Sequence, residues 1–351
     1  MSDNPKQMTS SPGPPADSLE PPVKSHEPPP EQSAGSPAQH HWHVLGAGAM
    51  GCLWAARLAE SATQPGLPPR ITLVLRDSSA LAAFAGHVIV ETTHGETMSF
   101  DMQAVSATQL DHPVSHLLIT TKAFDTEEAM RPILPWLSPD ATICLLQNGI
   151  RNHLRLQGMT DIQVLSMATS HGAWLKRRFH VVHAGAGQSF FGPLKTTDPA
   201  DTRDFSYSTF PADLATSMDL TPVADMEQRL WQKFAANCVI NGLTAIHNCQ
   251  NGELLTRPSA HQDLLSLCSE TESVLQHAGH LDIALYPYVR EILQATAANW
   301  SSTWQDVNAG RATEIDEFNG YLCELATEIS LPCPHNRAVL HAITGSHAVI
   351  R

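Results

Sequence analysis

The chain has 351 residues, 42% of them hydrophobic, and its 35 acidic residues outnumber the 21 lysines and arginines to give a formal net charge of −14. This length is sufficient for two globular domains, each with a hydrophobic core. The negative charge argues against binding to nucleic acid or to an anionic membrane. No apolar stretch is long enough to predict a helix that crosses a bilayer.

The cysteines and the N-terminus both bear on the cellular compartment. Seven cysteines occur, with no Cys-x-x-Cys pair and no metal-ligand spacing, a pattern that indicates reduced thiols. Residues 1–15 have neither the apolar core of a signal peptide nor the arginine-rich pattern of a transit peptide. We therefore expect a cytoplasmic protein.

Residues 1–40 contain ten prolines among Ser, Glu and Gln, with almost no side chain that could fill a core. This composition predicts a disordered tail. The tail could be a ligand for a proline-binding module, but a solubilising extension is the simpler interpretation.

Strands and helices are predicted to alternate from residue 41 onward, which is typical of a parallel, doubly wound sheet. The predicted strands are 43–45, 71–75, 117–121 and 143–146, and the predicted helices are 49–60 and 126–136. Two short runs at 179–183 and 189–191, around a glycine-rich turn, predict a hairpin at the sheet edge.

Strand patterns end near residue 224. The helical patterns that follow are 225–248, 261–277, 288–299, 314–329 and 335–343. The expected fold class is therefore α/β, with an N-terminal Rossmann dinucleotide-binding domain over residues 41–224 and an all-α C-terminal domain over residues 225–351.

A glycine-rich sequence, Gly46-Ala47-Gly48-Ala49-Met50-Gly51, joins the first predicted strand to the first predicted helix. In this context G-x-G-x-x-G is the dinucleotide-binding motif. Its first glycine permits a tight turn, its second lets the pyrophosphate approach the backbone, and its third lets helix and strand pack closely. The phosphates then face the positive end of the helix.

Arg76 and Asp77 follow the second predicted strand, where an NAD enzyme places an acid on the ribose 2′-hydroxyl. A guanidinium at this place can hold the 2′-phosphate of NADP by paired hydrogen bonds. Arg76 therefore favours NADP, unless it is only a solvated surface charge, and Asp77 leaves NAD as the weaker alternative.

Two further polar residues follow predicted strands. Lys122 comes after the strand 117–121, and Asn148 comes after the strand 143–146. Ligands of open α/β sheets bind at the carboxyl ends of the strands, so both residues are candidates for the site. Each alone could instead be a cap or a turn residue.

Lys233, Asn237 and Asn241 are spaced by four residues and share one stripe of a helix that is otherwise mostly apolar. Such a helix is largely buried, so its polar stripe must face partners or a wet cavity. Neighbouring helices could satisfy the stripe, but a lysine is rarely buried without a counter-charge or a function. The pattern favours an active site.

At this segment the sequence resembles the 2-dehydropantoate 2-reductases, or ketopantoate reductases, of pantothenate and coenzyme A biosynthesis. The likeness extends over about residues 43–330. It is carried by residues 230–254 and 301–316, the glycine motif, Arg76, Lys122-Ala123, Asn148-Gly149 and residues 170–173.

The resemblance implies an NADP-dependent oxidoreductase that reduces 2-dehydropantoate to pantoate. Lys233 would donate the proton, which suits an ammonium that also stabilises the developing alkoxide, and Glu314 would lie beside the reacting centre. The residues implied to contact the cofactor are the glycine motif, Arg76, Lys122, Asn148, Ala173 and Glu314. Those implied to bind the keto acid are Asn148, Lys233, Asn237, Asn241, Asn251 and Ser302.

Three residues depart from the family pattern. Arg151 replaces a common glycine, Asp125 a common glutamine and Gly242 a frequent proline. The first two bear on the shape of the expected cofactor loop.

No metal site is expected, because His277 and His280 lack a third ligand and the histidines at 40, 41 and 43 lie at the edge of the tail. The expected binding partner is a small 2-keto acid, and no binding to nucleic acid or to a membrane is expected. The chain is expected to be a monomer or a homodimer. Two alternative functions fit the pattern: another NADP-dependent dehydrogenase of 2-keto or 3-hydroxy acids, and a non-enzymic NADP-sensing protein. Lys233 and Glu314 favour an enzyme over a sensor.

Overall fold

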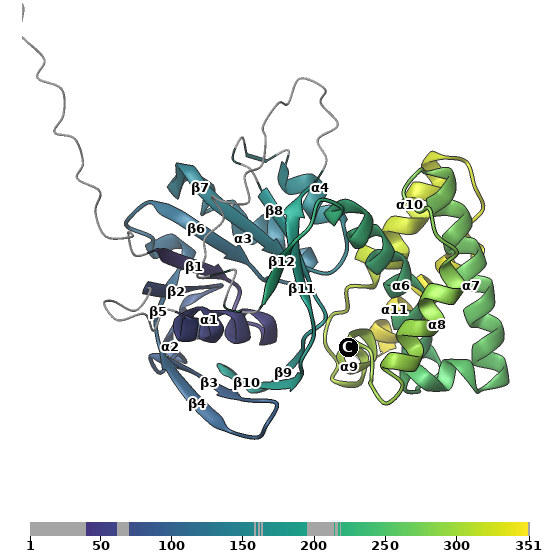
Figure 1. Ribbon diagram of the computed structural model, residues 1–351, viewed down its shortest axis with the longest axis horizontal. Helices are drawn as coiled ribbons and strands as arrows, with labels where there is room; N and C mark the ends of the chain where they lie inside the picture. Colours follow the sequence, from purple (N-terminus) through teal and green to yellow (C-terminus); the bar gives the residue numbers. More distant parts are fainter. Residues whose placement is uncertain are drawn as a thin grey trace, which may run out of the picture. The chain divides into compact units, whose positions relative to one another are not determined.

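The computed structural model describes residues 40–61, 70–157, 159–160, 162, 164–194, 214, 217 and 219–349. The predicted tail, apart from its last residue, lies outside the described residues. An N-terminal α/β part ends with strand β12 (Leu220–Pro222), and the described chain is helical from α6 (Met226–Ile246) onward (Figure 1). This arrangement confirms the expected fold class.

The larger sheet runs in the order β12-β11-β8-β7-β6-β1-β2-β5 within the described residues. Its other strands are β1 (His41–Leu45), β2 (Arg70–Leu75), β5 (Gln103–Ser106), β6 (Val114–Ile119), β7 (Leu137–Leu146), β8 (Val164–Thr169) and β11 (Ser189–Pro193). All neighbouring pairs are parallel except β8 with β11. The strand order reverses at β1, between β2 and β6, and such a reversal opens a crevice at the carboxyl ends of the strands.

A smaller sheet runs in the order β4-β3-β10-β9. Its strands are β3 (His87–Glu91), β4 (Thr97–Asp101), β9 (Gly172–Arg177) and β10 (His180–Gly185). The predicted hairpin is therefore wrong: β10 pairs with β3 and β9, whereas β11 pairs with β8 and β12 in the larger sheet. The true partner of β10 is β9, whose side chains are mostly exposed and gave no apolar signal.

The α/β part contains helices α1 (Ala49–Ser61), α2 (Ser78–Ala82), α3 (Thr126–Met130) and α4 (Arg151–Gln157). Helix α1 contacts β2 of the larger sheet and β3, β9 and β10 of the smaller one, which explains why it is buried on most sides (Figure 1). The predicted helix 126–136 ends early, at Met130, because Pro132 and Pro135 cannot donate helical hydrogen bonds. Short 3₁₀ turns lie at Ala107–Gln109, Ala123–Asp125 and Leu134–Trp136.

The helical part is arranged around α6, which contacts α7, α8, α9 and α11. Its further helices are α7 (Pro258–His277), α8 (Leu285–Ala295), α9 (Ser302–Asn308), α10 (Tyr321–Glu328) and α11 (Pro334–Val349), with a 3₁₀ turn at Asn251–Leu255 and a π-helical turn at Asp316–Gly320. A Cβ at Gly242 would lie 2.2 Å from Cγ1 of Val339. Gly242 therefore lets α11 pack directly on α6, which accounts for the missing proline.

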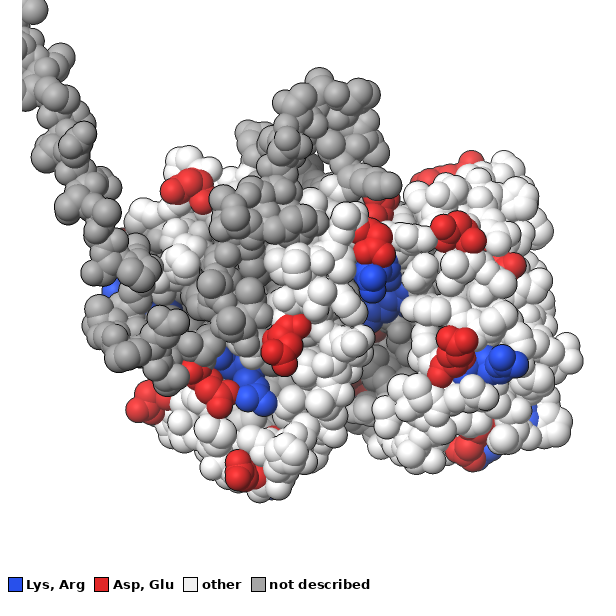
Figure 2. Space-filling model, viewed as in Figure 1, with Lys and Arg blue, Asp and Glu red and all other residues white. Residues whose placement is uncertain are grey.

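None of the helices in the described part of the chain is both long and apolar enough to cross a membrane. On the face shown in Figure 2, acidic and basic side chains are interspersed on a largely uncharged surface.

Candidate active site

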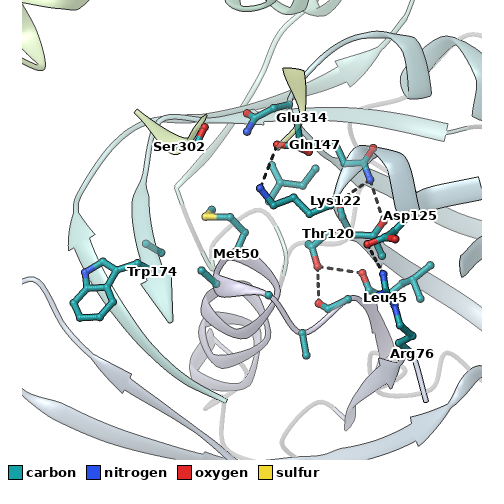
Figure 3. Close-up of a pocket in the computed structure, with 18 of the residues that line it drawn as sticks. Leu45, Met50, Arg76, Thr120, Lys122, Asp125, Gln147, Trp174, Ser302 and Glu314 are labelled. Carbon is teal, nitrogen blue, oxygen red and sulfur yellow. Dashed lines mark hydrogen bonds and ion pairs between the residues drawn. The ribbon is translucent and has the colours of Figure 1, made fainter. Parts of the chain in front are cut away.

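A cavity of about 1810 Å³ lies at the carboxyl edge of the larger sheet (Figure 3). The α/β part contributes the glycine motif, Arg76, Lys122, Asn148 and Ala173 to its walls, and the helical part contributes Thr296, Trp300, Ser302, Trp304 and Glu314. Pockets for one small ligand are typically about 300–1,000 Å³. This cavity therefore has room for a dinucleotide together with a small substrate.

The glycine motif is closely packed at two glycines and open at the third. Gly46 has a φ of +100°, and a Cβ there would lie 2.9 Å from the backbone nitrogen of Thr121. A Cβ at Gly51 would lie 1.9 Å from the carbonyl oxygen of Gly46. At Gly48, in contrast, a Cβ would meet nothing within 4 Å of the described residues. This open backbone edge at the start of α1 fits a pyrophosphate group.

Arg76 lies at the end of β2, where its mostly exposed side chain forms an ion pair with Asp125. The neighbouring Asp77 caps α2, because its Oδ1 accepts a hydrogen bond of 2.7 Å from the backbone nitrogen of Ala80. The carboxylate of Asp77 is thus engaged with a helix, while the guanidinium of Arg76 lines the cavity. The departure from the family pattern at Asp125 supplies the present partner of Arg76.

Lys122 lies between two carboxylates of the helical part. Its Nζ donates a hydrogen bond of 2.8 Å to Oδ2 of Asp306. It also lies 3.6 Å from Oε2 of Glu314 (Figure 3). Both carboxylates are buried, and Glu314 also accepts a hydrogen bond of 3.0 Å from the backbone nitrogen of Ala123. Burial by itself lowers the pKa of Lys122, but Glu314 and Asp306 outweigh it and leave the pKa raised. Lys122 therefore remains an ammonium.

Lys233 of α6 is placed at the same edge of the sheet. Its Nζ donates a hydrogen bond of 3.0 Å to the carbonyl oxygen of Thr169, the last residue of β8. Burial lowers the pKa of Lys233 to about 8, against the opposing effect of the Glu314 carboxylate. This amine can therefore exchange a proton near neutral pH, and Glu314 links it electrostatically to the cavity wall.

The two asparagines of the predicted polar stripe have side-chain amides that are available to bind a ligand. Asn237 is half-buried and Asn241 is buried, and neither side chain forms a hydrogen bond within the described part of the chain. Lys233, Asn237 and Asn241 are not among the described residues that line the cavity. The structure thus keeps this stripe together on α6 and next to the cavity, because Lys233 bonds to Thr169 and the following residue, Ser170, lines the cavity.

Asn251 and Ser302 differ in their surroundings. Nδ2 of Asn251 donates a hydrogen bond of 2.9 Å to Oγ1 of Thr296, and its buried Oδ1 has no partner among the described residues. Asn251 does not line the cavity either, although Thr296 does. Ser302 is exposed and lines the cavity, whereas its neighbour Ser301 caps α9 by accepting a hydrogen bond from the backbone nitrogen of Trp304.

The sequence alone did not identify three residues that organise this site. Oγ1 of Thr120 donates to the carbonyl oxygens of Leu45 and Gly46, and so fixes the entry to the glycine motif. Nε2 of Gln147 donates to the carbonyl oxygen of Thr121 at 2.8 Å. Asp306 holds Lys122, and its only sequence signal was its place within the segment that resembles the ketopantoate reductases.

Arg151, the second departure from the family pattern, joins α4 to the helical part. Its guanidinium forms an ion pair with Glu324 and lies 4.7 Å from the ring centroid of Tyr321. The side chain thus points to α10, and Gly149 alone has a positive φ in this loop, +81°.

A glycine-rich loop lies where the sheet reverses its strand order, and a helical domain that carries a lysine of lowered pKa follows it. This arrangement is typical of a two-domain oxidoreductase that uses a nicotinamide dinucleotide. Comparison with known proteins narrows this class. Residues 42–196 match the family described as "Ketopantoate reductase PanE/ApbA", and residues 225–347 match its C-terminal domain. The chain belongs to the ketopantoate reductase family.

One named relative supports this assignment, and two solved structures show the same fold. The chain is 33% identical to the 2-dehydropantoate 2-reductase of Vibrio cholerae over 309 residues, which are 86% of this chain and 95% of the relative. A probable 2-dehydropantoate 2-reductase from Bacillus subtilis shares the fold, with a TM-score of 0.71, 24% identity and coverage of 87% and 99% of the two chains. A D-mandelate dehydrogenase solved with NADH and anilino(oxo)acetate also shares it, with a TM-score of 0.77, 18% identity and coverage of 88% and 99%.

Proposed function

We propose that this protein reduces 2-dehydropantoate to pantoate with NADPH, the ketopantoate reductase step of pantothenate and coenzyme A biosynthesis. The observation that carries the proposal is the environment of Lys233. Its ammonium lies at the carboxyl edge of the sheet, 3.0 Å from the carbonyl oxygen of Thr169, and its pKa is lowered to about 8 by burial. A general acid works best when its pKa is near the operating pH.

A dinucleotide held by the glycine motif and Arg76 would supply the hydride for the keto carbon of the substrate. Lys233 donates a proton to the keto oxygen, so that the carbonyl becomes a secondary alcohol and the lysine becomes a neutral amine. The amine then takes a proton from solvent and is ready for another turnover. Glu314 favours the charged form of Lys233 and therefore helps to restore this ammonium.

The free amides on α6 and the hydroxyl of Ser302 provide binding groups for the keto acid. Asn237 and Asn241 can both donate and accept hydrogen bonds, so they suit a ligand that carries a hydroxyl and a carboxylate. They do so without adding charge. The positive charge that attracts the substrate carboxylate comes from Lys233, while Lys122 is already neutralised by Asp306 and Glu314.

Arg76 supports NADPH as the preferred cofactor, because its guanidinium lines the cavity while the carboxylate of Asp77 is occupied in capping α2. We expect Arg76→Ala to weaken NADPH binding by roughly 10- to 100-fold, the loss of one charge-assisted contact, and to leave NADH binding unchanged. Fluorescence titration with both cofactors measures this. Equal effects on NADPH and NADH would show that Arg76 does not read the 2′-phosphate.

The activity is tested by following NADPH oxidation with a panel of 2-keto acids: 2-dehydropantoate, 2-oxoisovalerate and phenylglyoxylate. The aromatic compound is included because Trp300 and Trp304 stack at a centroid distance of 3.8 Å in the cavity wall, which would favour an aryl 2-keto acid. The proposal requires the highest kcat/KM for 2-dehydropantoate. A preference for phenylglyoxylate would assign the protein to the alternative, a different 2-keto acid dehydrogenase, and no turnover with any compound would support a sensing role.

A further inference from the structure

A second group of polar side chains lies at the opposite edge of the larger sheet, where β1 begins. His41 and His43 are two residues apart and so project from the same face of this strand. His112 joins them from the segment that precedes β6. Among the described residues, one potential ligand atom from each of these histidines lies within 4.8 Å of the other two.

The histidine cluster, defined as His41, His43 and His112, contains buried nitrogen atoms that lack hydrogen-bond partners. His43 is 1% exposed, and neither of its ring nitrogens has a partner in the described part of the chain. Nε2 of His112 is also buried and without a partner there. An unpaired buried polar group destabilises the folded state, so a ligand that pairs with these atoms would stabilise the protein.

Two of the other ring nitrogens are held by neighbours in the manner of metal-bound histidines. Nδ1 of His112 contacts Oδ1 of Asp111, and Nε2 of His41 lies 2.8 Å from Oγ1 of Thr72. A metal-bound histidine usually donates its second ring nitrogen to a carboxylate or another acceptor, which fixes the orientation of the ring. Asp111 thus leaves Nε2 of His112 as the atom available to a metal.

Two charged residues adjoin the cluster: Arg70, which is the register partner of His41 between β1 and β2, and Asp111, which contacts His112. Neutral imidazole is the ligating form of histidine. Arg70 would repel a cation, and the carboxylate of Asp111 offsets this repulsion.

We propose that His41, His43 and His112 bind a divalent transition-metal ion, with Zn²⁺ as the best match to three imidazole ligands and one water molecule. Zn–N bonds of about 2.0–2.1 Å in a tetrahedral site place the nitrogens about 3.4 Å apart. The three ring centroids lie 4.3, 5.0 and 5.3 Å apart in the present structure. The ion would fasten the start of β1 to the segment before β6.

This site is structural, because it is separated from the reaction by the length of β1. The glycine motif follows the carboxyl end of that strand, and the cluster lies at its beginning. A rise of about 3.3 Å per residue puts roughly 10 Å between His43 and Gly46 and roughly 17 Å between His41 and Gly46. Metal binding should therefore change thermal stability and leave turnover unaltered.

The test uses the full chain, first treated with a chelator and then titrated with Zn²⁺ by calorimetry, with Co²⁺ absorption as a report on tetrahedral geometry. We expect one Zn²⁺ per chain. His112→Ala and His41→Ala should each weaken binding at least about tenfold, a loss at the lower end of that seen when a metal site is disturbed. Zn²⁺ should raise the Tm of the parent but not of His112→Ala, and NADPH turnover should be equal in both.

His94→Ala is the matched control, because His94 is exposed in the turn between β3 and β4, away from the cluster. It should bind Zn²⁺ as the parent does. Circular dichroism of each variant verifies that it is folded. The absence of saturable binding to the parent, or equal affinities for the parent, His41→Ala and His112→Ala, would overturn the proposal, as would an equal loss in His94→Ala.

Discussion

Lys122 and Lys233 occupy two regions of the same site and both interact with Glu314, yet their pKa values are shifted in opposite directions. Lys122 also contacts Asp306, and these carboxylates outweigh the effect of burial and raise its pKa. Lys233 has a neutral carbonyl oxygen as its hydrogen-bond partner, and burial lowers its pKa to about 8.

The difference shows that burial alone does not decide the charge of a lysine; the number of nearby carboxylates does. Lys122 is suited to hold its charge and to connect the α/β part to α9. Lys233 is suited to release its proton. The two lysines should therefore respond differently to mutation, and the following predictions test this contrast.

The largest effect is expected at Lys233. Lys233→Ala should fold but lose about 10²–10⁴-fold in kcat, the usual contribution of one general acid. Lys233→Arg is the matched control for charge, because a guanidinium remains protonated and cannot act as the acid. Its kcat should be low as well. Turnover of Lys233→Ala within about threefold of the parent, close to assay scatter, would remove the catalytic role.

Lys122→Ala should act on binding and stability instead. We expect KM for NADPH to rise roughly tenfold with a smaller change in kcat, and the free energy of unfolding to fall by about 1–3 kcal/mol, because Asp306 and Glu314 lose a cation that is itself partly exposed. Steady-state kinetics and urea denaturation measure both. Lys176→Ala, which removes an exposed lysine paired with Glu91, is the control and should change neither. A loss confined to kcat would show that Lys122 acts in catalysis as Lys233 does, and would contradict the proposed difference between the two lysines.

Glu314→Gln tests the group that the two lysines share. Glu314 raises the pKa of Lys233, so its neutralisation should lower that pKa further below about 8. Activity requires the ammonium and is lost as the pH rises through this pKa. The alkaline limb of the pH–rate profile should therefore move to lower pH in the variant. An unchanged profile with a lower Tm would assign Glu314 a structural role, through its hydrogen bond from Ala123.

The smallest effect is expected at the exposed rim of the cavity, where Arg76 pairs with Asp125. Asp125→Asn should tighten NADPH binding by up to about fivefold, because an exposed ion pair is worth only about 0–1 kcal/mol. NADH binding should not change. Glu127→Gln, which removes a nearby exposed acid outside the cavity lining, is the control. Weaker NADPH binding in Asp125→Asn would show that Asp125 orients Arg76 and does not compete for it.

Features that depend on the spacing of neighbouring residues can be predicted from the sequence. The glycine motif between β1 and α1, the polar residues after β2, β6 and β7, and the stripe from Lys233 to Asn241 could all be predicted. The reason is that the turn geometry of glycine and the repeats of strand and helix are properties of neighbouring residues. Fold class follows from the order of these elements.

Contacts between residues far apart in the chain are seen only in the folded structure. The residues around Lys122 and Arg76 in the sequence do not predict their contacts with Asp306 and Asp125. Nor does the sequence predict that His112 lies at the start of β1. It likewise gave no sign that β10 and β11 belong to different sheets, because alternating side chains define a strand without defining its partner. The charge of a lysine depends on such encounters, since burial and nearby carboxylates, not its position in the chain, set its pKa.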